Sequence, residues 1–320
     1  MPLPEKALIA RIRRLARGEG NLVAGIGDDC AVLRLPAGNE ALVTTDFSLE
    51  GIHFRRDWHS PESVGHRCLA RGLSDIAAMG GEPVAVFLSL ALPIDVAQAW
   101  VNRFARSMVS LAEKYGARLS GGDTAESPNG ILADIIVLGV VPKGKAVLRS
   151  GARPGDRIFI TGGLGGSAEA VAQLRAQPKR KLNSRDYLRH FYPEPRIEVG
   201  RALREKGLAS AMIDTSDGLS TDLAHLCEES RVGAEISAAL IPRARVGKPA
   251  REVDLDFSFH GGEDYELLFT SPPGKRVPQK IAGVAVTQIG EIKQGGGVVV
   301  NNPKGISFEL NPKGWEHFRK

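Results

Sequence analysis

The segment ALVTTDFSLEGIHF, residues 41–54, places a carboxylate, Asp46, at the end of a hydrophobic run that is typical of a strand. Shortly before it, GIGDDCAVL at residues 25–33 sets two adjacent carboxylates, Asp28 and Asp29, directly after a glycine turn. Like charges placed close together repel each other, so a fold keeps such a group only where something positive neutralises it. Basic side chains, protons and metal ions are the three possibilities.

The same arrangement recurs along the chain, where carboxylates flanked by Gly, Ser or Thr follow predicted strand ends. The further motifs are LSDIAAMGG with Asp75, SGGDTAES with Asp123, IDTSDG with Asp214 and Asp217, and HGGEDYE with Glu263 and Asp264. Ligands of open α/β sheets bind at such edges, and glycine lets backbone amides approach phosphate closely. Turn chemistry explains any one of these motifs alone. Together, because Mg²⁺ prefers oxygen ligands, they predict a metal–phosphate site.

Length and composition set the class of protein. At roughly 150 residues per domain, the 320 residues predict two domains. Hydrophobic residues make up 42% and charged residues 25%, as in globular proteins with a full core. The apolar runs are about half as long as the ~20 residues that cross a bilayer, so no membrane segment is expected. No secretory signal is recognisable at the N-terminus, and we expect a cytoplasmic protein.

The cysteines and the net charge exclude further classes. Cys30, Cys68 and Cys227 lie far apart with no C-x-x-C pair, which argues against a disulfide framework and a zinc site. The net charge of +5 comes from scattered basic residues with little aromatic interleaving. A solvated basic face is therefore favoured over a nucleic-acid interface.

Helix-type and strand-type segments alternate, which predicts a mixed α/β (α+β) fold. In the first half we expect helices at 4–17, 60–80 and 95–116 and strands at 41–46, 84–92 and 130–141. Pro, Gly and charged residues around 142–155 indicate a domain boundary, giving domains 1–145 and 146–320. In the second half we expect strands at 157–161 and near 211 and 267, helices after 166, 195 and 218, and a hairpin with a glycine turn at 286–302.

Motifs of other phosphate-binding proteins are missing or weak. The sequence has no G-x-x-x-x-G-K-[ST], H-R-D or D-F-G, which excludes P-loop enzymes and protein kinases. GGLGGSA at 162–168 fits a dinucleotide fingerprint, but no strand ending in an acid follows at the required distance.

The order of the motifs resembles the thiamine-monophosphate kinase family, within the aminoimidazole-ribonucleotide-synthetase superfamily. The motifs are GIGDDCAV, TTD…GIHF, LSDIAAMGG, SGGDTAES, ITGGLGGS, IDTSDGLSTDL and GGEDYELLFT, over about residues 20–320. GIHF together with a C-terminal PKGWEHF separates this family from relatives such as selenophosphate synthetase. The resemblance implies an N-terminal α/β domain that dimerises across a barrel-like interface and a C-terminal α/β domain, with ATP between them in a cytoplasmic homodimer.

The resemblance also implies a reaction and its residues. The reaction is ATP-dependent, Mg²⁺-assisted phosphorylation of thiamine monophosphate to thiamine diphosphate, with several Mg²⁺ ions. The implied metal positions are Asp29, Thr44, Thr45, Asp46, Asp75, Asp123, Asp214 and Asp217. The implied nucleotide positions are Gly122, Asp123, Arg149 and Ser216, and the implied substrate positions are His53, Glu263 and Trp315. Where the family often has Tyr, this chain has Phe104 nearby, and the correspondence in the 170–190 loop is loose.

Physical chemistry agrees with this mechanism. No general base is needed, because a substrate phosphate is already largely ionised at pH 7. Arg149 suits a phosphate as a charged fork, although a structural role explains it equally well. Trp315 offers a flat face to a cationic ring, although without the resemblance packing of the C-terminal segment is favoured. Two alternatives stay open. One is another ATP-dependent enzyme of the superfamily that acts on a different phosphate or carboxylate; the other is a non-enzymatic protein that binds structural Ca²⁺ and nucleic acid.

Overall fold

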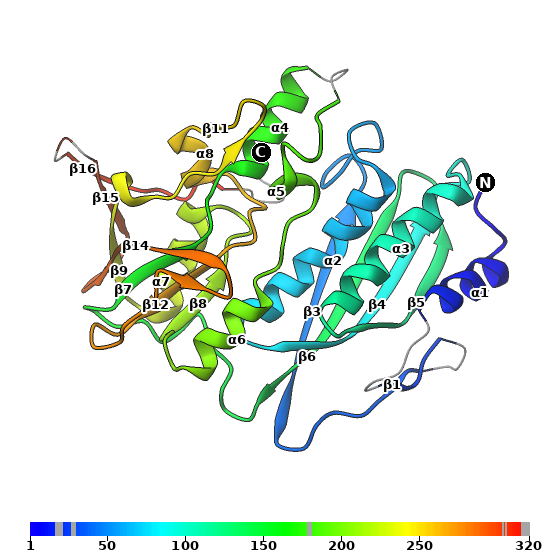
Figure 1. Cartoon of the computed structure of the whole chain (residues 1–320), viewed down its shortest axis with the longest axis horizontal. Coiled ribbons are helices and arrows are strands. Elements are labelled where there is room, and N and C mark those ends of the chain that lie inside the picture. The colour runs from blue at the N-terminus through cyan, green and yellow to red at the C-terminus, as the bar shows by residue number, and fades with distance from the viewer. Residues whose placement is uncertain (17–21, 27–29, 178–180, 303, 305, 315–320) are drawn as a thin grey trace. The chain divides into compact units, whose positions relative to one another are not determined.

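The computed structural model of the 320-residue chain describes residues 1–16, 22–26, 30–177, 181–302, 304 and 306–314. Asp28, Asp29 and Trp315 therefore lie outside the described residues. The chain divides into two compact units (Figure 1). The first consists of Met1–Ile76 with Gly81–Gly144, and the second of Ala77–Gly80 with Lys145–Lys320.

A four-stranded sheet forms the centre of the first unit. Its strands, in spatial order, are β3 (Asn39–Leu49), β6 (Leu132–Pro142), β4 (Glu82–Leu92) and β5 (Arg118–Glu126). The β3–β6 and β6–β4 pairs are antiparallel, whereas β4 and β5 are parallel. One face of the sheet is covered by two helices, α2 (Pro61–Ala78) and α3 (Gln98–Lys114) (Figure 1). Helix α1 (Glu5–Leu15) lies beside α3, and β1 (Leu22–Ala24) pairs with β2 (Val32–Leu33).

The helices predicted for this unit are confirmed as α1, α2 and α3. Gly80 and Gly116 follow the ends of α2 and α3 with φ of +66° and +77°, a left-handed backbone that glycine adopts without strain. The predicted strands correspond to β3, β4 and β6, but β5 is an additional strand that the sequence does not predict. Its stretch SGGDTAE has the glycines and the polar residues of a turn.

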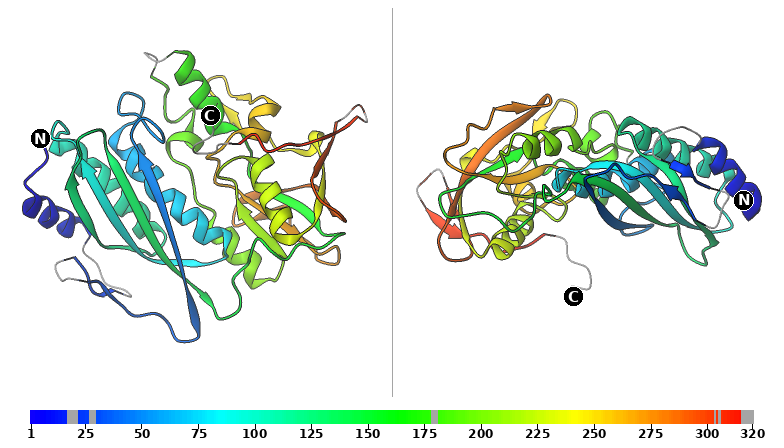
Figure 2. Two further views of the ribbon diagram at one scale, coloured as in Figure 1. Left: turned by 180° about the vertical axis from the view of Figure 1, so that it is seen from behind. Right: turned by 90° about the horizontal axis from the view of Figure 1, so that it is seen from below.

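Alternation along the strands gives the sheet two different faces. Ile135 and Val137 of β6 point toward α2 and are fully buried. Residues of the opposite parity point the other way, and Val43, Phe47 and Ile136 are 68%, 56% and 37% exposed. No helix of the described residues covers this second face (Figure 2). Leu33 of β2 packs at the Val140 end of this face, and the remainder, around Val43, Phe47 and Ile136, is the uncovered sheet face of the first unit.

The second unit is built on a larger sheet with helices around it. Its strands, in spatial order, are β16 (Ser307–Glu309), β15 (Val298–Asn301), β9 (Gly233–Ser237), β14 (Val284–Lys293), β7 (Arg157–Thr161), β12 (Leu267–Ser271) and β8 (Ala211–Asp214), and β13 (Lys280–Ile281) pairs with β14. The helices are α4 (Gly166–Ala176), α5 (Leu188–Phe191), α6 (Ile197–Glu205), α7 (Leu219–Ser230), α8 (Leu255–His260) and the short 3₁₀ helix η1 (Ala238–Leu240). A separate ribbon joins β10 (Arg245–Val246) and β11 (Arg251–Glu252).

The hairpin predicted at 286–302 is wrong. Strand β9 lies between β14 and β15, antiparallel to the first and parallel to the second. The glycine loop that joins β14 to β15 passes over the beginning of β9, where the Ala234 amide donates to the Gly297 carbonyl at 2.9 Å. A Cβ on Gly233 would lie 3.1 Å from the Gly296 carbonyl oxygen. The glycines therefore allow two chain segments to pass closely, which is a different role from a tight turn.

The core of the second unit lies between its central strands and α7. Ile158 and Ile160 of β7, Ile213 of β8, Leu268 of β12 and Leu223 of α7 belong to one buried cluster. This packing fixes the end of β8 and the beginning of α7, between which the IDTSDG motif runs. In the described part of the chain, we find no helix with both the length and the hydropathy to cross a bilayer.

Candidate functional site

Two carboxylates and a hydroxyl meet in the first unit where β3 packs on α2. Asp46 lies within β3, and Asp75 lies in the last turn of α2. The prediction that Asp46 ends its strand is wrong, because β3 continues to Leu49. Asp75 lies in the helix predicted at 60–80, which is confirmed as α2. Thr44 and Asp46 share the face toward α2, and the Thr44 hydroxyl donates a hydrogen bond to the Asp75 carboxylate.

Negative charge exceeds positive charge around Asp46. Burial, together with the neighbouring Asp75 charge, raises the pKa of Asp46 to about 7. The charge of Arg71, whose Nε lies 3.7 Å from Asp46 Oδ1, opposes this shift without cancelling it. A divalent cation at this point would favour the ionised carboxylates.

Thr45 lies on the opposite face of β3. Its hydroxyl donates to Asp134 Oδ1 of β6 at 2.8 Å, on the uncovered side of the sheet. Because successive side chains of a strand point to opposite faces, Thr44 and Thr45 cannot both face Asp75. The structure thus brings Thr44, Asp46 and Asp75 together and separates Thr45 from them.

Gly122 and Asp123 belong to β5, at the other edge of the same sheet. Gly122 has a φ of +147°, and a Cβ there would lie 1.9 Å from the Leu88 carbonyl oxygen, so this position requires glycine. Asp123 is exposed, and its Oδ1 accepts a hydrogen bond from the Thr124 amide at 2.8 Å. Strands β3 and β5 are three inter-strand spacings apart, about 14 Å. One metal ion cannot join Asp46 and Asp123 within one copy of this unit.

In the second unit, two predicted motifs lie side by side. Asp214 is the last residue of β8 and is buried, and the loop from 215 to 218 leads into α7. The Glu263 amide donates to the Ser216 carbonyl at 2.8 Å, and the Tyr265 amide donates to the Thr215 carbonyl at 2.9 Å. These bonds place Glu263, predicted for the substrate, next to Ser216, predicted for the nucleotide.

Asp222 is a site residue that the sequence analysis missed. Its Oδ2 accepts hydrogen bonds from the amides of Asp217 and Gly218, at 3.2 and 3.0 Å. Burial raises the pKa of Asp222 well above its usual value, and the charges of Asp214 and Asp217 raise it further. The signal was an acid in the first turn of a predicted helix, directly after the IDTSDG turn. Three carboxylates, those of Asp214, Asp217 and Asp222, therefore lie in or beside the loop between β8 and α7.

The GGEDYE loop has an unusual backbone. Glu263 and Tyr265 have φ of 63° and 52°, a left-handed conformation that costs a non-glycine residue on the order of 1 kcal/mol. Between them Asp264 is buried, and its carboxylate accepts hydrogen bonds from the Gly165 and Ser167 amides at the beginning of α4, at 2.5 and 3.4 Å. Burial raises the pKa of Asp264 to about 7.

Glu266 anchors this loop and was also missed. Its carboxylate is fully buried and binds Arg189 Nη1 at 2.5 Å, Arg196 Nε at 2.7 Å and the Thr161 hydroxyl at 2.6 Å. Burial alone would raise its pKa, but the hydrogen bonds and charges of the two arginines lower it overall. An acid directly before the apolar run LLF, as in ELLF, was the available signal for a buried ion pair.

Three further residues named in the sequence analysis, His53, Arg149 and Phe104, lie elsewhere, and Gly314 is the described residue next to the predicted Trp315. His53 follows β3, and its Nδ1 accepts a hydrogen bond from the Leu49 amide at 3.0 Å. Arg149 is exposed, and its carbonyl accepts from the Ser230 hydroxyl at 2.8 Å. The Gly314 amide donates to Thr221 Oγ1 at 3.1 Å, at the beginning of α7. Phe104 is fully buried in α3, where it stacks on a neighbouring tryptophan, and is no accessible nucleotide contact.

Comparison with known proteins adds the family. Residues 27–141 match the AIR synthase related protein, N-terminal domain, and residues 153–302 match the AIR synthase related protein, C-terminal domain. The thiamine-monophosphate kinase of Escherichia coli K12 is 39% identical over 99% of this chain and 99% of its own length. The chain belongs to the thiamine-monophosphate kinase family.

Solved structures of this kinase family have the same architecture. A thiamine-monophosphate kinase from Stenotrophomonas maltophilia K279a superposes with a TM-score of 0.80 at 34% identity, covering 94% of this chain and 98% of that one. AaThiL complexed with AMPPCP and TMP superposes with a TM-score of 0.77 at 32% identity, covering 99% of both chains. The two-domain mixed α/β fold predicted from the sequence is therefore confirmed.

The donor groups of this family member suit Mg²⁺. Thr44, Asp46 and Asp75 supply only oxygen atoms, as do Asp214 and Asp217. Among the described residues, no group of three or more His, Cys, Asp or Glu side chains could hold a metal ion by itself. Mg²⁺ is usually bound by one or two carboxylates plus waters and substrate phosphates, so this arrangement fits an ion that binds together with a nucleotide.

Proposed function

We propose that this protein transfers the terminal phosphate of ATP to thiamine monophosphate, giving thiamine diphosphate and ADP. The observation that carries the proposal is the 39% identity to the Escherichia coli thiamine-monophosphate kinase over 99% of both chains. The relative complexed with AMPPCP, an ATP analogue, and TMP supports the same pair of substrates, since it matches this chain over its full length. A different substrate would require that a chain with these motifs in this order has changed its specificity.

The carboxylates of the two units would hold Mg²⁺ against the phosphates. Thr44, Asp46 and Asp75 are the donors in the first unit, and Asp214 and Asp217 are those in the second. When bound, Mg²⁺ would neutralise the negative charge of the phosphoryl group during its transfer. The shortage of positive charge around Asp46 supports this role, because burial and Asp75 hold the pKa of Asp46 at about 7. Asp29 is a further expected ligand outside the described residues.

The substrate and nucleotide contacts are proposed for residues whose positions the neighbouring loops restrain. Ser216 and Glu263, joined by a backbone hydrogen bond, would face the nucleotide and the substrate respectively. Gly122 and Arg149 are further proposed nucleotide contacts, and His53 is a further substrate contact. Trp315 would stack on a ring of thiamine. Trp315 lies outside the described residues.

No general base is part of this mechanism. The nucleophile is a phosphate oxygen of thiamine monophosphate, whose second pKa near 6 leaves it largely ionised at pH 7. Protein groups would act by holding two phosphates in line and by neutralising their oxygens. His53 accepts a hydrogen bond from the Leu49 amide through Nδ1, an arrangement that suits binding and orientation.

We also propose a cytoplasmic homodimer that forms through the uncovered sheet face of the first unit. Val43, Phe47 and Ile136 are large apolar residues exposed on this face. A second copy would bury them and would add another β5 edge near β3. The Asp46 and Asp123 carboxylates of two copies could then approach each other, although about 14 Å separates their strands within one copy.

The test is direct measurement of product. Purified protein is incubated with ATP, Mg²⁺ and thiamine monophosphate, and thiamine diphosphate is quantified by chromatography after oxidation to its fluorescent derivative. We expect turnover that stops on chelation of Mg²⁺ and that is at least 100-fold lower with selenide, aminoimidazole precursors or simple carboxylates. Turnover of one of these in place of thiamine monophosphate would contradict the proposal.

A further inference from the structure

Asp217 differs from the other described carboxylates proposed for Mg²⁺ in the kind of backbone that carries it. The others lie in strands or in a helix: Asp46 in β3, Asp123 in β5, Asp214 at the end of β8 and Asp75 in α2. A side chain on a strand or a helix takes its direction from that element. Asp217 lies in the loop at 215–218, so its direction depends on the hydrogen bonds of that loop.

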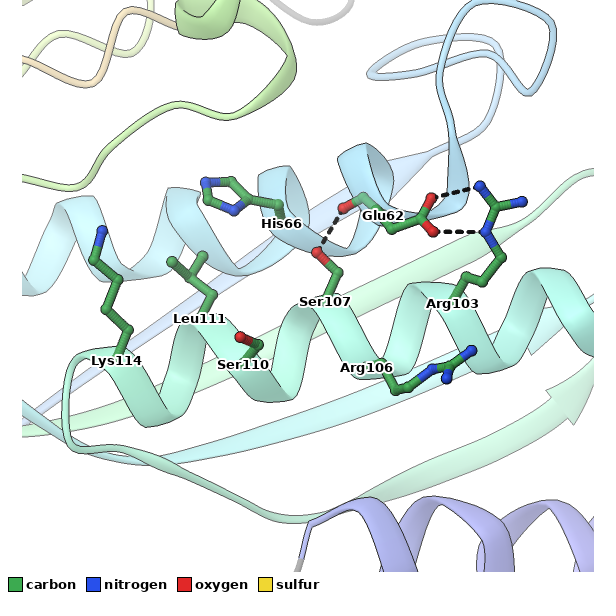
Figure 3. A pocket seen from close by; sticks show the side chains of 8 residues that line it. All are labelled: Glu62, His66, Arg103, Arg106, Ser107, Ser110, Leu111 and Lys114. Carbon is green, nitrogen blue, oxygen red and sulfur yellow. Dashed lines mark hydrogen bonds and ion pairs between the residues drawn. The ribbon is translucent and has the colours of Figure 1, made fainter. Parts of the chain in front are cut away.

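Helix α2 shows how an element holds such a carboxylate. It is tied to α3 near its beginning, where the Ser107 hydroxyl donates to the Glu62 carbonyl at 2.8 Å and Arg103 Nε donates to the Glu62 carboxylate at 2.6 Å (Figure 3). Asp75, in the last turn of the same helix, is held by the packing of a whole helix. The loop that carries Asp217 is held by individual bonds instead.

The first half of this loop is held by backbone groups of the GGEDYE motif. The Thr215 amide donates to the Glu266 carbonyl at 2.8 Å, and the Thr215 carbonyl accepts from the Tyr265 amide at 2.9 Å. The Ser216 carbonyl accepts from the Glu263 amide at 2.8 Å. Since these bonds join backbone to backbone, a change of side chain at another position does not remove them.

The second half of the loop is held by a side chain. Asp222 Oδ2 accepts from the amides of Asp217 and Gly218, at 3.2 and 3.0 Å, and the residue is 1% exposed. These two amides stand on either side of the Asp217 Cα, so a single acceptor for both restricts the two backbone dihedral angles of Asp217. Successive amides of this kind form a concavity for an anion, which here is a carboxylate of the chain itself. The direction of the Asp217 side chain therefore follows from Asp222.

Helix capping explains only part of this arrangement. Helix α7 begins directly after Gly218, which has no side chain to cap it, and an acid in the first turn that bonds to the Gly218 amide stabilises such a helix end. The Asp217 amide lies before the cap and belongs to the loop, so a bond to it adds nothing to the helix. Capping alone would need the first bond and not the second.

We infer that Asp222 is a positioning residue, which directs the Asp217 carboxylate toward bound Mg²⁺ through the two amides. This inference rests on the proposed function, in which Asp217 is a Mg²⁺ ligand. Asp214 is set independently, because it is paired with Leu267 of β12 in the sheet. Loss of Asp222 should therefore weaken Mg²⁺ binding without abolishing it, by the ~10-fold to 100-fold that is typical of residues that orient metal ligands.

The experiment measures Mg²⁺ binding through thermal stability. The melting temperature of each protein, saturated with the ATP analogue AMPPCP, is followed as Mg²⁺ is added, and the Mg²⁺ concentration that gives half of the rise is determined. Asp222→Ala removes the acceptor, and Asp222→Leu removes it while filling the same space. We expect both variants to need at least about 10-fold more Mg²⁺ than the parent. Asp222→Asn keeps an oxygen acceptor and should stay within about 3-fold of the parent.

Leu226→Ala is the matched control. Leu226 is fully buried one turn further along α7, so this change lowers stability without touching the loop. Its melting temperature should be lower at every Mg²⁺ concentration, with the half-rise concentration of the parent. The KM for thiamine monophosphate should stay within about 3-fold of the parent in all variants, because Glu263 keeps its backbone bond to Ser216. If the acceptor-free variants behaved like Leu226→Ala, or if neither of them folded, Asp222 would be a structural residue and the inference would be overturned.

Hydrogen exchange tests the two bonds without metal. In metal-free protein, exchange of the amides at 217 and 218, followed by mass spectrometry over residues 214–222, should be faster in the acceptor-free variants and unchanged in Asp222→Asn. Equal exchange in all of these proteins would show that Asp222 does not hold the loop. The proposed function fails separately, if the parent forms no thiamine diphosphate; the Mg²⁺ requirement and the exchange rates then still decide the role of Asp222.

Discussion

Asp46 and Asp75 come from elements distant in sequence and yet share one small space. The covalent chain does not force them together; the packing of α2 on β3 does, and the Thr44 hydroxyl bonded to Asp75 fixes the contact. Repulsion between the two carboxylates is one reason why the pKa of Asp46 is raised to about 7. A fold that keeps such repulsion loses stability unless a ligand relieves it, so these residues are better explained by binding than by stability.

Asp75→Asn tests this explanation. Asn keeps the size of the side chain and an acceptor for Thr44 while removing the charge. We expect kcat for thiamine diphosphate formation to fall at least 100-fold, because a metal ligand is lost. The metal-free variant should be as stable as the parent or more stable by about 1 kcal/mol, because repulsion is relieved. Both quantities are measured in parallel, by turnover and by urea unfolding in metal-free buffer.

The control for this variant is Asp95→Asn, which removes an exposed carboxylate of the same unit that pairs with Arg56. Its kcat and its free energy of unfolding should stay close to those of the parent. If Asp75→Asn lost several kcal/mol of stability without metal, Asp75 would be a structural partner and the proposed metal group would lose a central member.

Asp264 makes a prediction about pH. Its pKa is about 7 in the folded protein and near 3.8 in the unfolded chain, mainly because of burial. Between these values the folded state holds a proton that the unfolded state has released. The contribution of Asp264 to the free energy of unfolding therefore falls as pH rises from about 4 to 7, by up to about 4 kcal/mol, and is constant above that range.

Asp264→Asn removes this titration. The variant does not titrate, so from pH 5 to pH 8 the free energy of unfolding of the parent should fall relative to that of the variant, by up to about 4 kcal/mol. Urea unfolding at both pH values gives the two differences. Asp95→Asn, which removes an exposed carboxylate that pairs with the permanently charged Arg56, should show the same small difference at each pH. A difference that is the same at pH 5 and at pH 8 would show that the folded protein holds Asp264 ionised at both.

At the scale of elements, glycine shows both the reach and the limit of sequence analysis. Gly80 and Gly116 are correctly predicted as helix ends, because a helix stop is a local event. The glycines of SGGD and QGGG look like turns, and yet one pair lies within β5 and the other set lets a loop pass over β9. Local sequence does not specify which segment approaches a glycine, so β5 was missed and the hairpin was wrong.

Two glycines of α2 give a matched test of close packing. A Cβ on Gly65 would lie 2.2 Å from the Phe104 carbonyl oxygen of α3, whereas one on Gly72 would meet the side-chain ends of Ile135 and Val137, the nearer at 2.5 Å. Backbone cannot move aside without shifting a helix. Since both Gly→Ala changes gain about 1 kcal/mol of helix propensity, their difference reports packing alone.

We expect Gly65→Ala to lower the free energy of unfolding by about 2–3 kcal/mol, and Gly72→Ala to lower it by about 1 kcal/mol or less. Chemical unfolding of the two variants beside the parent measures this order. Gly65→Ala should also lower kcat, because a shifted α2 displaces Asp75, which it carries. Equal stability of the two variants would mean that α2 and α3 are free to move apart.

At the scale of the whole molecule, the order of the motifs predicted the family, and through it the two-domain fold. The site was predicted less completely. The roles of Asp222 and Glu266 depend on burial and on partners that are distant in sequence. The Arg196 guanidinium, for example, is 70 positions away from Glu266. Thr44 and Thr45 are adjacent in sequence, and only strand geometry shows that they face opposite sides. Motif order identifies the family, whereas three-dimensional packing assigns the individual roles.

The uncovered sheet face of the first unit leads to the last prediction. Phe47 and Val43 are more than half exposed in one copy, a state that water disfavours and that a second copy would end. We expect the parent to sediment as a dimer at 10 μM, and Phe47→Glu, which would bury a charge in that interface, to sediment as a monomer. Turnover should fall when the dimer dissociates. The β3 edge with Asp46 and the β5 edge with Asp123, about 14 Å apart in one copy, would then no longer meet across two copies. Ile94→Glu, at a 60% exposed residue in the turn after β4, is the matched control and should remain dimeric and active. A parent that is monomeric at this concentration and still fully active would show that the face serves another purpose and that each copy carries a complete site.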